Sequence, residues 1–264
     1  SRIATPSELT TRGPAPCGKT DWTRRPTGSG SWGITTPSCV TGAITSAFAP
    51  GRSPSTTPML CKWSWPMQRP ETIWIIGASD GIGAALAREW SKRGVRLILS
   101  ARSAEPLEKL AASLGPDHIA LPLDVSDRTS LDEASQKLSD LVPLDRVVHL
   151  AAMYDPGKVM DIDPEAAAKL VTVNLTGTLN VAQVASPLLK EGGQLALCGS
   201  IAGYIGLPQG QIYSATKAGV INFTESLRVE LADSRDVRLI NPGFVDTRMT
   251  QRNDFDMPAM VTPE

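Results

Sequence analysis

The sequence has little of what membrane spans, metal centres and disulfide frameworks require. It contains no run of 18 apolar residues and no secretory signal pattern. Only 4 cysteines and 2 histidines occur among its 264 residues. Cys17, Cys39 and Cys61 are evenly spaced, too far apart for paired zinc ligands and without histidines nearby, and Cys198 lies in an apolar stretch. We therefore expect a soluble cytoplasmic protein with no metal site, no disulfide framework and no membrane partner.

The first 66 residues lack any sustained helical or strand period. Thr, Ser, Pro and Gly supply 37 of them, and the segment carries a net charge of +5 against −6 for residues 67–264. Such a composition cannot bury enough apolar surface to offset the entropy of ordering the backbone. Residues 1–66 are therefore predicted to be disordered or artefactual, and residues 67–264 to form the folded domain.

Three interpretations of residues 1–66 remain open. A shortage of acids suits a mitochondrial transit peptide, but nine prolines argue against the amphipathic helix that such a peptide needs. A basic arm for nucleic acid or a membrane would need clustered cations, and the seven here are scattered. We favour a stretch translated or fused upstream of Met67, which opens just before the first predicted strand, and we expect no nucleic-acid partner.

Apolar β-branched runs alternate with helical patterns through the rest of the chain. The predicted strands cover residues 72–76, 95–100, 118–122, 146–151, 194–199 and 237–241. The predicted helices cover residues 81–93, 104–114, 127–140, 163–190 and 211–233. This alternation predicts an α/β fold of the Rossmann type, a doubly wound sheet of six parallel strands.

A glycine-rich turn joins the first predicted strand to the first predicted helix. It runs from Gly77 to Gly83 and has the pattern G-x-x-x-G-x-G. Glycines at such a turn let backbone N–H groups and a helix N-terminus approach a pyrophosphate, although a tight turn without a ligand is the alternative. The predicted cofactor contacts of the turn are Gly77, Ser79, Asp80, Gly81, Ile82 and Gly83.

The end of the second predicted strand indicates which dinucleotide fits. An NAD site wants a carboxylate there for the ribose 2′-OH, whereas NADP wants a cation for its 2′-phosphate. The chain offers Ser100 and Arg102 and no competing acid at that strand end. We favour NADP over NAD, although Asp80 in the glycine turn weakens the case and Arg102 could be an ordinary exposed arginine.

Tyr213 and Lys217 lie four residues apart in a predicted helix, so both side chains should project from one face. An ammonium held near the phenol should lower the pKa of Tyr213, and a shift of about two to three units would suit acid/base chemistry at neutral pH. By itself the pair is also compatible with a solvated helix face.

Further short motifs accompany the glycine turn. They are, in order, Asp124 with Val125, Asn174 to Gly177, Ser200, Tyr213 to Lys217, and Pro242 with Gly243. Their order and spacing resemble those of the short-chain dehydrogenase/reductase family, over residues 72 to about 250. The resemblance implies an oxidoreductase that transfers hydride between a nicotinamide cofactor and a small carbonyl or alcohol substrate.

The resemblance also implies the roles of individual residues. Asn174 holds a water against Lys217, Ser200 binds the reacting oxygen, Tyr213 is the acid/base, and Lys217 binds the cofactor ribose. Asp124 and Val125 hold the adenine, although Asp124 could instead cap the helix that follows. The remaining implied cofactor contacts are Ala151, Ala152, Pro242, Gly243, Val245 and Thr247.

The chain departs from the family pattern after the fourth predicted strand. Where the family has Asn-Asn-Ala-Gly, this sequence has His149, Leu150, Ala151 and Ala152. His149 could be mistaken for a catalytic residue, but it ends an apolar strand. We expect it to be a packed strand residue that hydrogen bonds a neighbouring loop.

Several functional questions stay open at this stage. The same fold could serve a catalytically silent dinucleotide sensor or scaffold, which would not need the predicted catalytic residues. Family members continue into a seventh strand, so these 264 residues look like a fragment of a protein that forms a homo-oligomer when full length, and an unstable, inactive fragment is a further alternative. The residues expected to face the substrate are mostly apolar and are Met153, Tyr154, Tyr204, Leu207, Phe244 and Met249.

Overall fold

A computed structural model describes residues 70–253 and 255–263 of the chain. The predictions for residues 1–66, including those for Cys17, Cys39 and Cys61, lie outside these residues. The described part contains one parallel sheet with the strand order β3-β2-β1-β4-β5-β6. Its strands are β1 (Thr72–Ile76), β2 (Arg96–Ser100), β3 (Ile119–Ala120), β4 (Leu144–His149), β5 (Leu189–Cys198) and β6 (Asp236–Ile240). The predicted α/β doubly wound sheet is confirmed.

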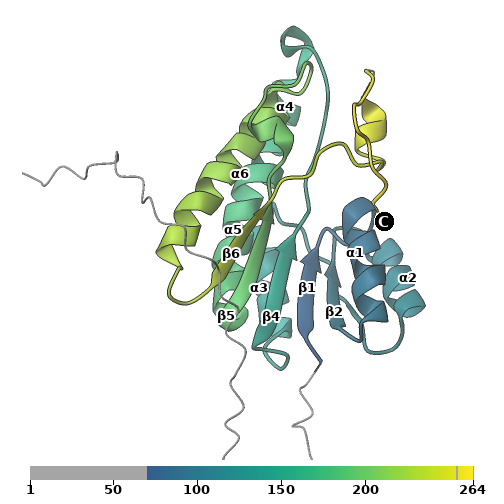
Figure 1. Ribbon diagram of the computed structural model, residues 1–264, viewed down its shortest axis with the longest axis vertical. Helices are drawn as coiled ribbons and strands as arrows, with labels where there is room; N and C mark the ends of the chain where they lie inside the picture. Colours follow the sequence, from purple (N-terminus) through teal and green to yellow (C-terminus); the bar gives the residue numbers. More distant parts are fainter. Residues whose placement is uncertain (1–69, 254, 264) are drawn as a thin grey trace, which may run out of the picture. The chain divides into compact units, whose positions relative to one another are not determined.

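Helices cover both faces of the sheet (Figure 1). The α-helices are α1 (Gly81–Lys92), α2 (Ala104–Leu114), α3 (Arg128–Lys137), α4 (Pro164–Val171), α5 (Gly177–Ala185) and α6 (Gln211–Glu230). The shorter helical segments are η1 (Val159–Asp161), η2 (Thr172–Thr176), η3 (Ser186–Leu188), η4 (Ile201–Gly203) and η5 (Thr250–Arg252).

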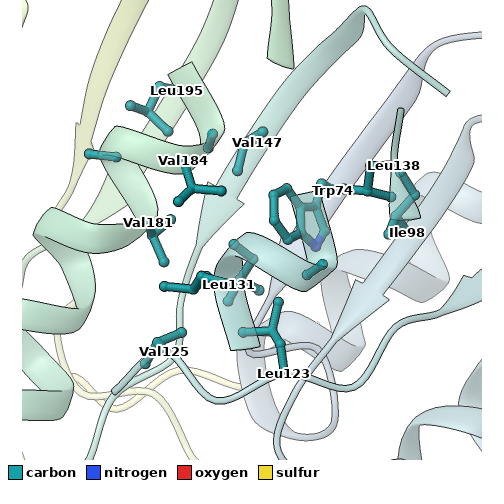
Figure 2. Close-up of a cluster of buried hydrophobic side chains, with 14 of the residues drawn as sticks. Trp74, Ile98, Leu123, Val125, Leu131, Leu138, Val147, Val181, Val184 and Leu195 are labelled. Carbon is teal, nitrogen blue, oxygen red and sulfur yellow. The ribbon is translucent and has the colours of Figure 1, made fainter. Parts of the chain in front are cut away.

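Strand β1 shows how the sequence builds two separate cores. Its five residues are all buried, and successive side chains of a strand point to opposite faces of the sheet. Ile73 and Ile75 pack with apolar residues of α1 and α2. Trp74 and Ile76 pack on the other face, with α3 and α5, as the cluster in Figure 2 shows. Fully burying each aliphatic side chain contributes about 1.5–3 kcal/mol, so this alternation fixes which helices lie on which face.

The helix predicted for residues 163–190 is helical throughout residues 164–185, with a π-helical turn in its middle, but its predicted end is wrong. Asp163 caps α4, the π-helical turn η2 follows, and α5 ends at Ala185. Pro187 then lies in the 3₁₀ turn η3, and Leu189 pairs with Leu144 of β4. Residues 189–193 therefore belong to β5, because pairing with β4 is a tertiary interaction that their local sequence does not encode. The strand predicted from residue 194 accordingly starts five residues earlier, at Leu189, and every other predicted boundary lies within about three residues of the observed one.

Candidate active site

The glycine turn closes the carboxyl end of β1 against two neighbouring strands. The amides of Gly77 and Ala78 donate to the Ser100 carbonyl at 2.7 and 3.0 Å. Gly77 has a φ of 95°, and a Cβ there would collide with the backbone of Ala151, while a Cβ on Gly83 would collide with the carbonyl of Gly77. Only glycine fits these two positions, which lets α1 begin directly above the strand end.

Asp80 caps α1 with one carboxylate oxygen and binds a distant residue with the other. Its Oδ1 accepts from the Gly81 amide at 2.8 Å, and its Oδ2 lies 2.7 Å from Nη2 of Arg248. Arg248 comes from the segment after β6, which crosses the carboxyl ends of the strands toward α1 (Figure 1). Thr247 reaches the same turn, because its Cγ2 lies 3.0 Å from where a Gly81 Cβ would stand.

The residues predicted near the adenosine occupy different environments. The Ser100 hydroxyl is fully buried and accepts from Trp74 Nε1 at 2.8 Å, so its side chain is turned away from the cavity described below. Asp124 accepts from the amide and hydroxyl of Ser126 at 2.9 and 2.6 Å. Although burial alone would raise it, these bonds and the Arg102 guanidinium hold the pKa of Asp124 below its usual value.

Asp124 does not cap the following helix, which was the alternative considered for it. Helix α3 begins at Arg128, and the cap is Asp127, whose Oδ1 accepts from the Thr129 amide at 2.9 Å. The carboxylate of Asp124 instead forms a local turn with Ser126. Two cations, Arg102 just after β2 and Lys169 of α4, also favour the charged form of this carboxylate.

Ser200, Tyr213 and Lys217 meet at the carboxyl end of β5. Ser200 caps η4, where its hydroxyl accepts from the Ala202 amide at 3.1 Å, and it lies beside Tyr213 in the first turn of α6. Lys217, one turn later, is 3% exposed, and its Nζ donates to the Cys198 carbonyl at 2.8 Å. The Lys217 Nζ lies 5.6 Å from the centre of the Tyr213 ring, so the two project from one face as expected.

The expected lowering of the Tyr213 pKa is not found in the protein alone. Burial, followed by the neighbouring Cys198, raises the pKa of Tyr213 far above its ordinary value, and the hydrogen bond with Ser200 only partly offsets this. Burial also lowers the pKa of Lys217. The loss of water around the phenol, which depends on the tertiary structure, outweighs the charge of Lys217. In this structure Tyr213 is a neutral phenol that holds its proton.

Asn174 lies in the π-helical turn η2 and ties three elements together. Its Oδ1 accepts from the Met153 amide at 2.7 Å, and its Nδ2 donates to the Met153 carbonyl at 2.9 Å and to Thr216 Oγ1 at 3.2 Å. Thr216 in turn donates to the Tyr213 carbonyl at 2.7 Å. A π-helical turn often marks a functional position, and this one places a buried amide beneath α6.

His149 is buried at the end of β4, as predicted, but its partner is a helix rather than a loop. Its Nε2 lies 3.1 Å from Thr178 Oγ1 of α5. The Thr178 hydroxyl already donates to the Asn174 carbonyl at 2.6 Å, so it must accept from His149. The other ring nitrogen, Nδ1, has no hydrogen-bond partner among the described residues. Burial and the nearby Lys217 lower the pKa of His149 to about 3, so the ring is neutral.

The segment after β6 is also anchored on the substrate side. Arg252 donates to the Tyr154 carbonyl and to Asp155 Oδ1, both at 2.7 Å. The Tyr154 hydroxyl donates to Asn253 Oδ1 at 2.6 Å, and the Tyr154 ring packs edge-on against Tyr213 with 5.0 Å between centroids. The stretch after β6 therefore spans the site, from the glycine turn at Asp80 to the loop after β4.

These elements enclose a cavity of about 550 Å³, within the range of small-molecule sites. Most predicted site residues line it: Gly77, Ser79, Asp80, Gly81, Ile82, Gly83, Arg102, Val125, Ala151, Ala152, Ser200, Tyr213, Lys217, Pro242, Gly243, Val245 and Thr247. Ser100, Asp124 and Asn174 are not among the lining residues. Sequence reasoning missed Arg248, Arg252 and Asn253 as site residues. Their one sequence signal is that they follow Thr247 closely.

A smaller cavity of about 50 Å³ adjoins the first beside Tyr213. Of the residues expected to face substrate, Tyr154, Leu207, Phe244 and Met249 line it, and Met153 lines the larger cavity. Tyr204 lines neither cavity of the described residues. Its side chain is exposed, and its hydroxyl accepts from Asn241 Nδ2 at 3.2 Å.

Within residues 70–253 and 255–263, no group of three or more His, Cys, Asp or Glu side chains is arranged to hold a metal ion. No helix in the same residues is both long and apolar enough to cross a bilayer.

Comparison with known proteins assigns the chain to a family. Residues 71–257 match the sequence model of the family described as short chain dehydrogenase. The chain belongs to the short-chain dehydrogenase family. An uncharacterized oxidoreductase of Staphylococcus epidermidis is 34% identical over 185 residues, which cover 69% of this chain and 80% of that protein. One from Staphylococcus aureus is 35% identical over 184 residues, 67% of this chain and 78% of its own length.

A solved structure supports the same assignment. The crystal structure named short-chain dehydrogenase/reductase SDR:glucose/ribitol dehydrogenase, from Brucella melitensis, superposes with a TM-score of 0.66 and 28% identity. The match covers 69% of this chain and 75% of that one. As a short-chain dehydrogenase, the protein is an oxidoreductase that uses NAD or NADP. The residues present fit such a cofactor, because Gly77, Gly81 and Gly83 line the cavity at the first turn of α1, where backbone N–H groups can approach a diphosphate.

Proposed function

We propose that this short-chain dehydrogenase is NADP-dependent and interconverts a carbonyl with a secondary or primary alcohol, with Tyr213 as the acid/base. One observation carries the proposal. The side chains of Ser200 and Tyr213 line the same cavity as the glycine turn, and both also line the smaller cavity beside it. A substrate oxygen bound at these two hydroxyls would lie where the smaller cavity meets the larger one, which the glycine turn lines.

The two hydroxyls have separate tasks in the proposed reduction. When bound, the reduced nicotinamide supplies a hydride to the carbonyl carbon. Tyr213 donates its phenolic proton to the carbonyl oxygen, and Ser200 donates a hydrogen bond to that oxygen as negative charge develops on it. A buried phenol with a raised pKa keeps its proton at neutral pH, so donating that proton requires stabilisation of the phenolate that is left. Oxidation of the alcohol reverses both transfers.

Lys217 and Asn174 are proposed to support Tyr213 without touching the reacting carbon. Lys217 keeps a cation 5.6 Å from the phenol ring, which would favour the phenolate left after proton donation. Its proposed contact with the cofactor ribose and the water proposed between it and Asn174 rest on the family resemblance. Asn174 is bonded to Thr216, whose hydroxyl holds the Tyr213 backbone.

The lining of the smaller cavity favours a neutral, mostly apolar substrate. Leu207, Phe244 and Met249 contribute apolar surface, and the polar members are uncharged, such as Thr250 and Asn253. A carboxylate or phosphate on the substrate would find no cation in that lining. We therefore propose a hydrophobic ketone, an aldehyde or the corresponding alcohol.

The preference for NADP rests on Arg102, which lines the large cavity at the end of β2. Its guanidinium suits the 2′-phosphate of NADP. Arg102→Asp should reverse the preference, because a carboxylate repels that phosphate and accepts from the 2′-OH of NAD. Binding of NADPH and NADH to both proteins, measured by calorimetry, tests this. Equal affinity of the unaltered protein for both nucleotides would contradict the assignment.

The activity itself is tested with a panel of apolar ketones and aldehydes, each with NADPH and NADH. Oxidation of the nucleotide that depends on substrate supports the proposed function. A protein that binds the nucleotide but oxidises none of it with any member of the panel would instead fit a sensor or scaffold. The homo-oligomer and the cytoplasmic location stay predictions, which light scattering and fractionation can check.

A further inference from the structure

Arg248 and the start of α1 hold a carboxylate of the protein between them. One oxygen of Asp80 accepts from the Gly81 amide at 2.8 Å, and the other lies 2.7 Å from Arg248 Nη2. The two donors come from opposite ends of the domain sequence and face the same small anion. Arg248, Gly81 and Asp80 all line the large cavity. The arrangement is therefore an anion site made of a guanidinium and a helix N-terminus.

The carboxylate in this site is weakly held. The side chains of Arg248 and Asp80 are 81% and 48% exposed, and exposed ion pairs of this kind contribute little because water screens them. A diphosphate carries more charge than a carboxylate, and a guanidinium binds phosphate oxygens with two parallel hydrogen bonds. The first turn of α1 adds the positive end of the helix dipole. An incoming diphosphate therefore competes with Asp80 for the same two donors.

We infer that Arg248 is a ligand of the dinucleotide's diphosphate, and that Asp80 is an internal anion that occupies Arg248 and the Gly81 amide until the dinucleotide displaces it. The inference rests on dinucleotide binding in this cavity. Asp80 lowers the affinity for both NAD and NADP, since both carry the diphosphate. Arg248 raises the affinity for both and does not choose between them.

Calorimetric titration of the whole chain with NADPH and with NADH tests the inference. Arg248→Gln should weaken both about tenfold, the loss of one charge-assisted hydrogen-bonded pair. Arg248→Lys keeps the positive charge but loses the paired N–H donors of the guanidinium, so its affinity should lie between those of Arg248→Gln and the unaltered protein. Asp80→Asn keeps an oxygen for the Gly81 amide while removing the competing charge, so it should tighten both nucleotides about threefold.

Arg93→Gln is the matched control. Arg93 pairs with Glu89 at 2.8 Å at the other end of α1 and is similarly exposed, so this variant removes the same charge away from the cavity. It should bind both nucleotides as the unaltered protein does. Thermal melts of all variants establish that each is folded.

The outcomes separate the inference from the proposed function. An unaltered protein that binds neither nucleotide contradicts the dinucleotide site itself. Normal binding by Arg248→Gln, with tight binding by the unaltered protein, overturns the inference alone. If Arg248→Gln weakens the binding of NADPH but not of NADH, the diphosphate assignment is overturned, and Arg248 would instead be a ligand of the 2′-phosphate. Weaker binding by Asp80→Asn would show that Asp80 orients Arg248 rather than competing for it.

Discussion

At the scale of single residues, burial sets the protonation state of the polar side chains in the site. Tyr213 has lost most of its water, and the charge of Lys217 is directed at the Cys198 carbonyl. The phenol consequently keeps its proton before any ligand arrives. His149 is also buried away from water, so its ring is neutral, and its Nε2–H donates to the Thr178 hydroxyl.

Tyr213→Phe should abolish hydride transfer while leaving nucleotide binding intact. The variant loses only the phenolic hydroxyl, and its ring can still pack against Tyr154. We expect turnover to fall at least about 10²-fold, the low end for a positioned acid. Steady-state kinetics and nucleotide titration measure the two effects separately. Turnover within a few-fold of the unaltered protein would remove Tyr213 from the mechanism.

His149 should make the protein less stable in mild acid. Its pKa is about 3 in the folded protein against an ordinary value of 6.5, so below pH 6.5 the unfolded chain binds a proton that the folded protein does not. The free energy of unfolding therefore falls as the pH drops from 6.5 toward 3, by about 2 kcal/mol from this group at pH 5. His149→Asn, which keeps an N–H donor but does not titrate, should show a shallower fall.

Urea unfolding of both proteins between pH 7 and pH 5 gives the two slopes. Comparing slopes rather than absolute stabilities cancels the packing cost of the replacement. Parallel slopes would mean that the ring is already charged or exposed in the folded protein.

At the scale of elements, two short helical segments, η2 and η4, position polar side chains against the long helix α6. The π-helical turn η2 directs Asn174 toward Thr216 of α6, and η4 holds Ser200 beside Tyr213. The contact between η4 and α6 depends on Gly203. A Cβ there would approach the Lys217 carbonyl carbon to 2.8 Å and the Ala218 nitrogen to 2.9 Å.

Gly203→Ala should push η4 away from α6. We expect a loss of about 1–3 kcal/mol of stability, as for other overpacked contacts, and a fall in kcat because Ser200 moves relative to Tyr213. Gly206→Ala is the matched control, because a Cβ at Gly206 has no neighbour within 4 Å. Chemical unfolding and kinetics on both variants decide the point. Equal behaviour of the two variants would contradict the role given to the contact.

At the scale of the whole molecule, the composition divides the chain into a net +5 segment and a net −6 remainder. Every site residue discussed above lies in the remainder. Removing residues 1–66 should therefore leave activity unchanged and shift the melting temperature by less than about 2 °C, the effect of at most roughly 1 kcal/mol of lost contacts. A large fall in melting temperature would show that residues 1–66 stabilise the domain.

The sequence by itself determined the order of elements, the six-stranded parallel sheet and the family. These features follow from local patterns: the buried run at residues 72–76, the glycine spacing at Gly77 and Gly83, and the four-residue step from Tyr213 to Lys217. Each needs only a short window of sequence, because strand, turn and helix geometry are local.

Only the tertiary structure decided the charges and partners within the site. The raised pKa of Tyr213 comes from burial by other elements, and the partner of His149 is on a helix 29 residues away. Asp80 and Arg248 are separated by most of the domain sequence, yet they share one ion pair. Desolvation and pairing depend on which segments meet in space, and the folded sheet, not any local pattern, sets those meetings.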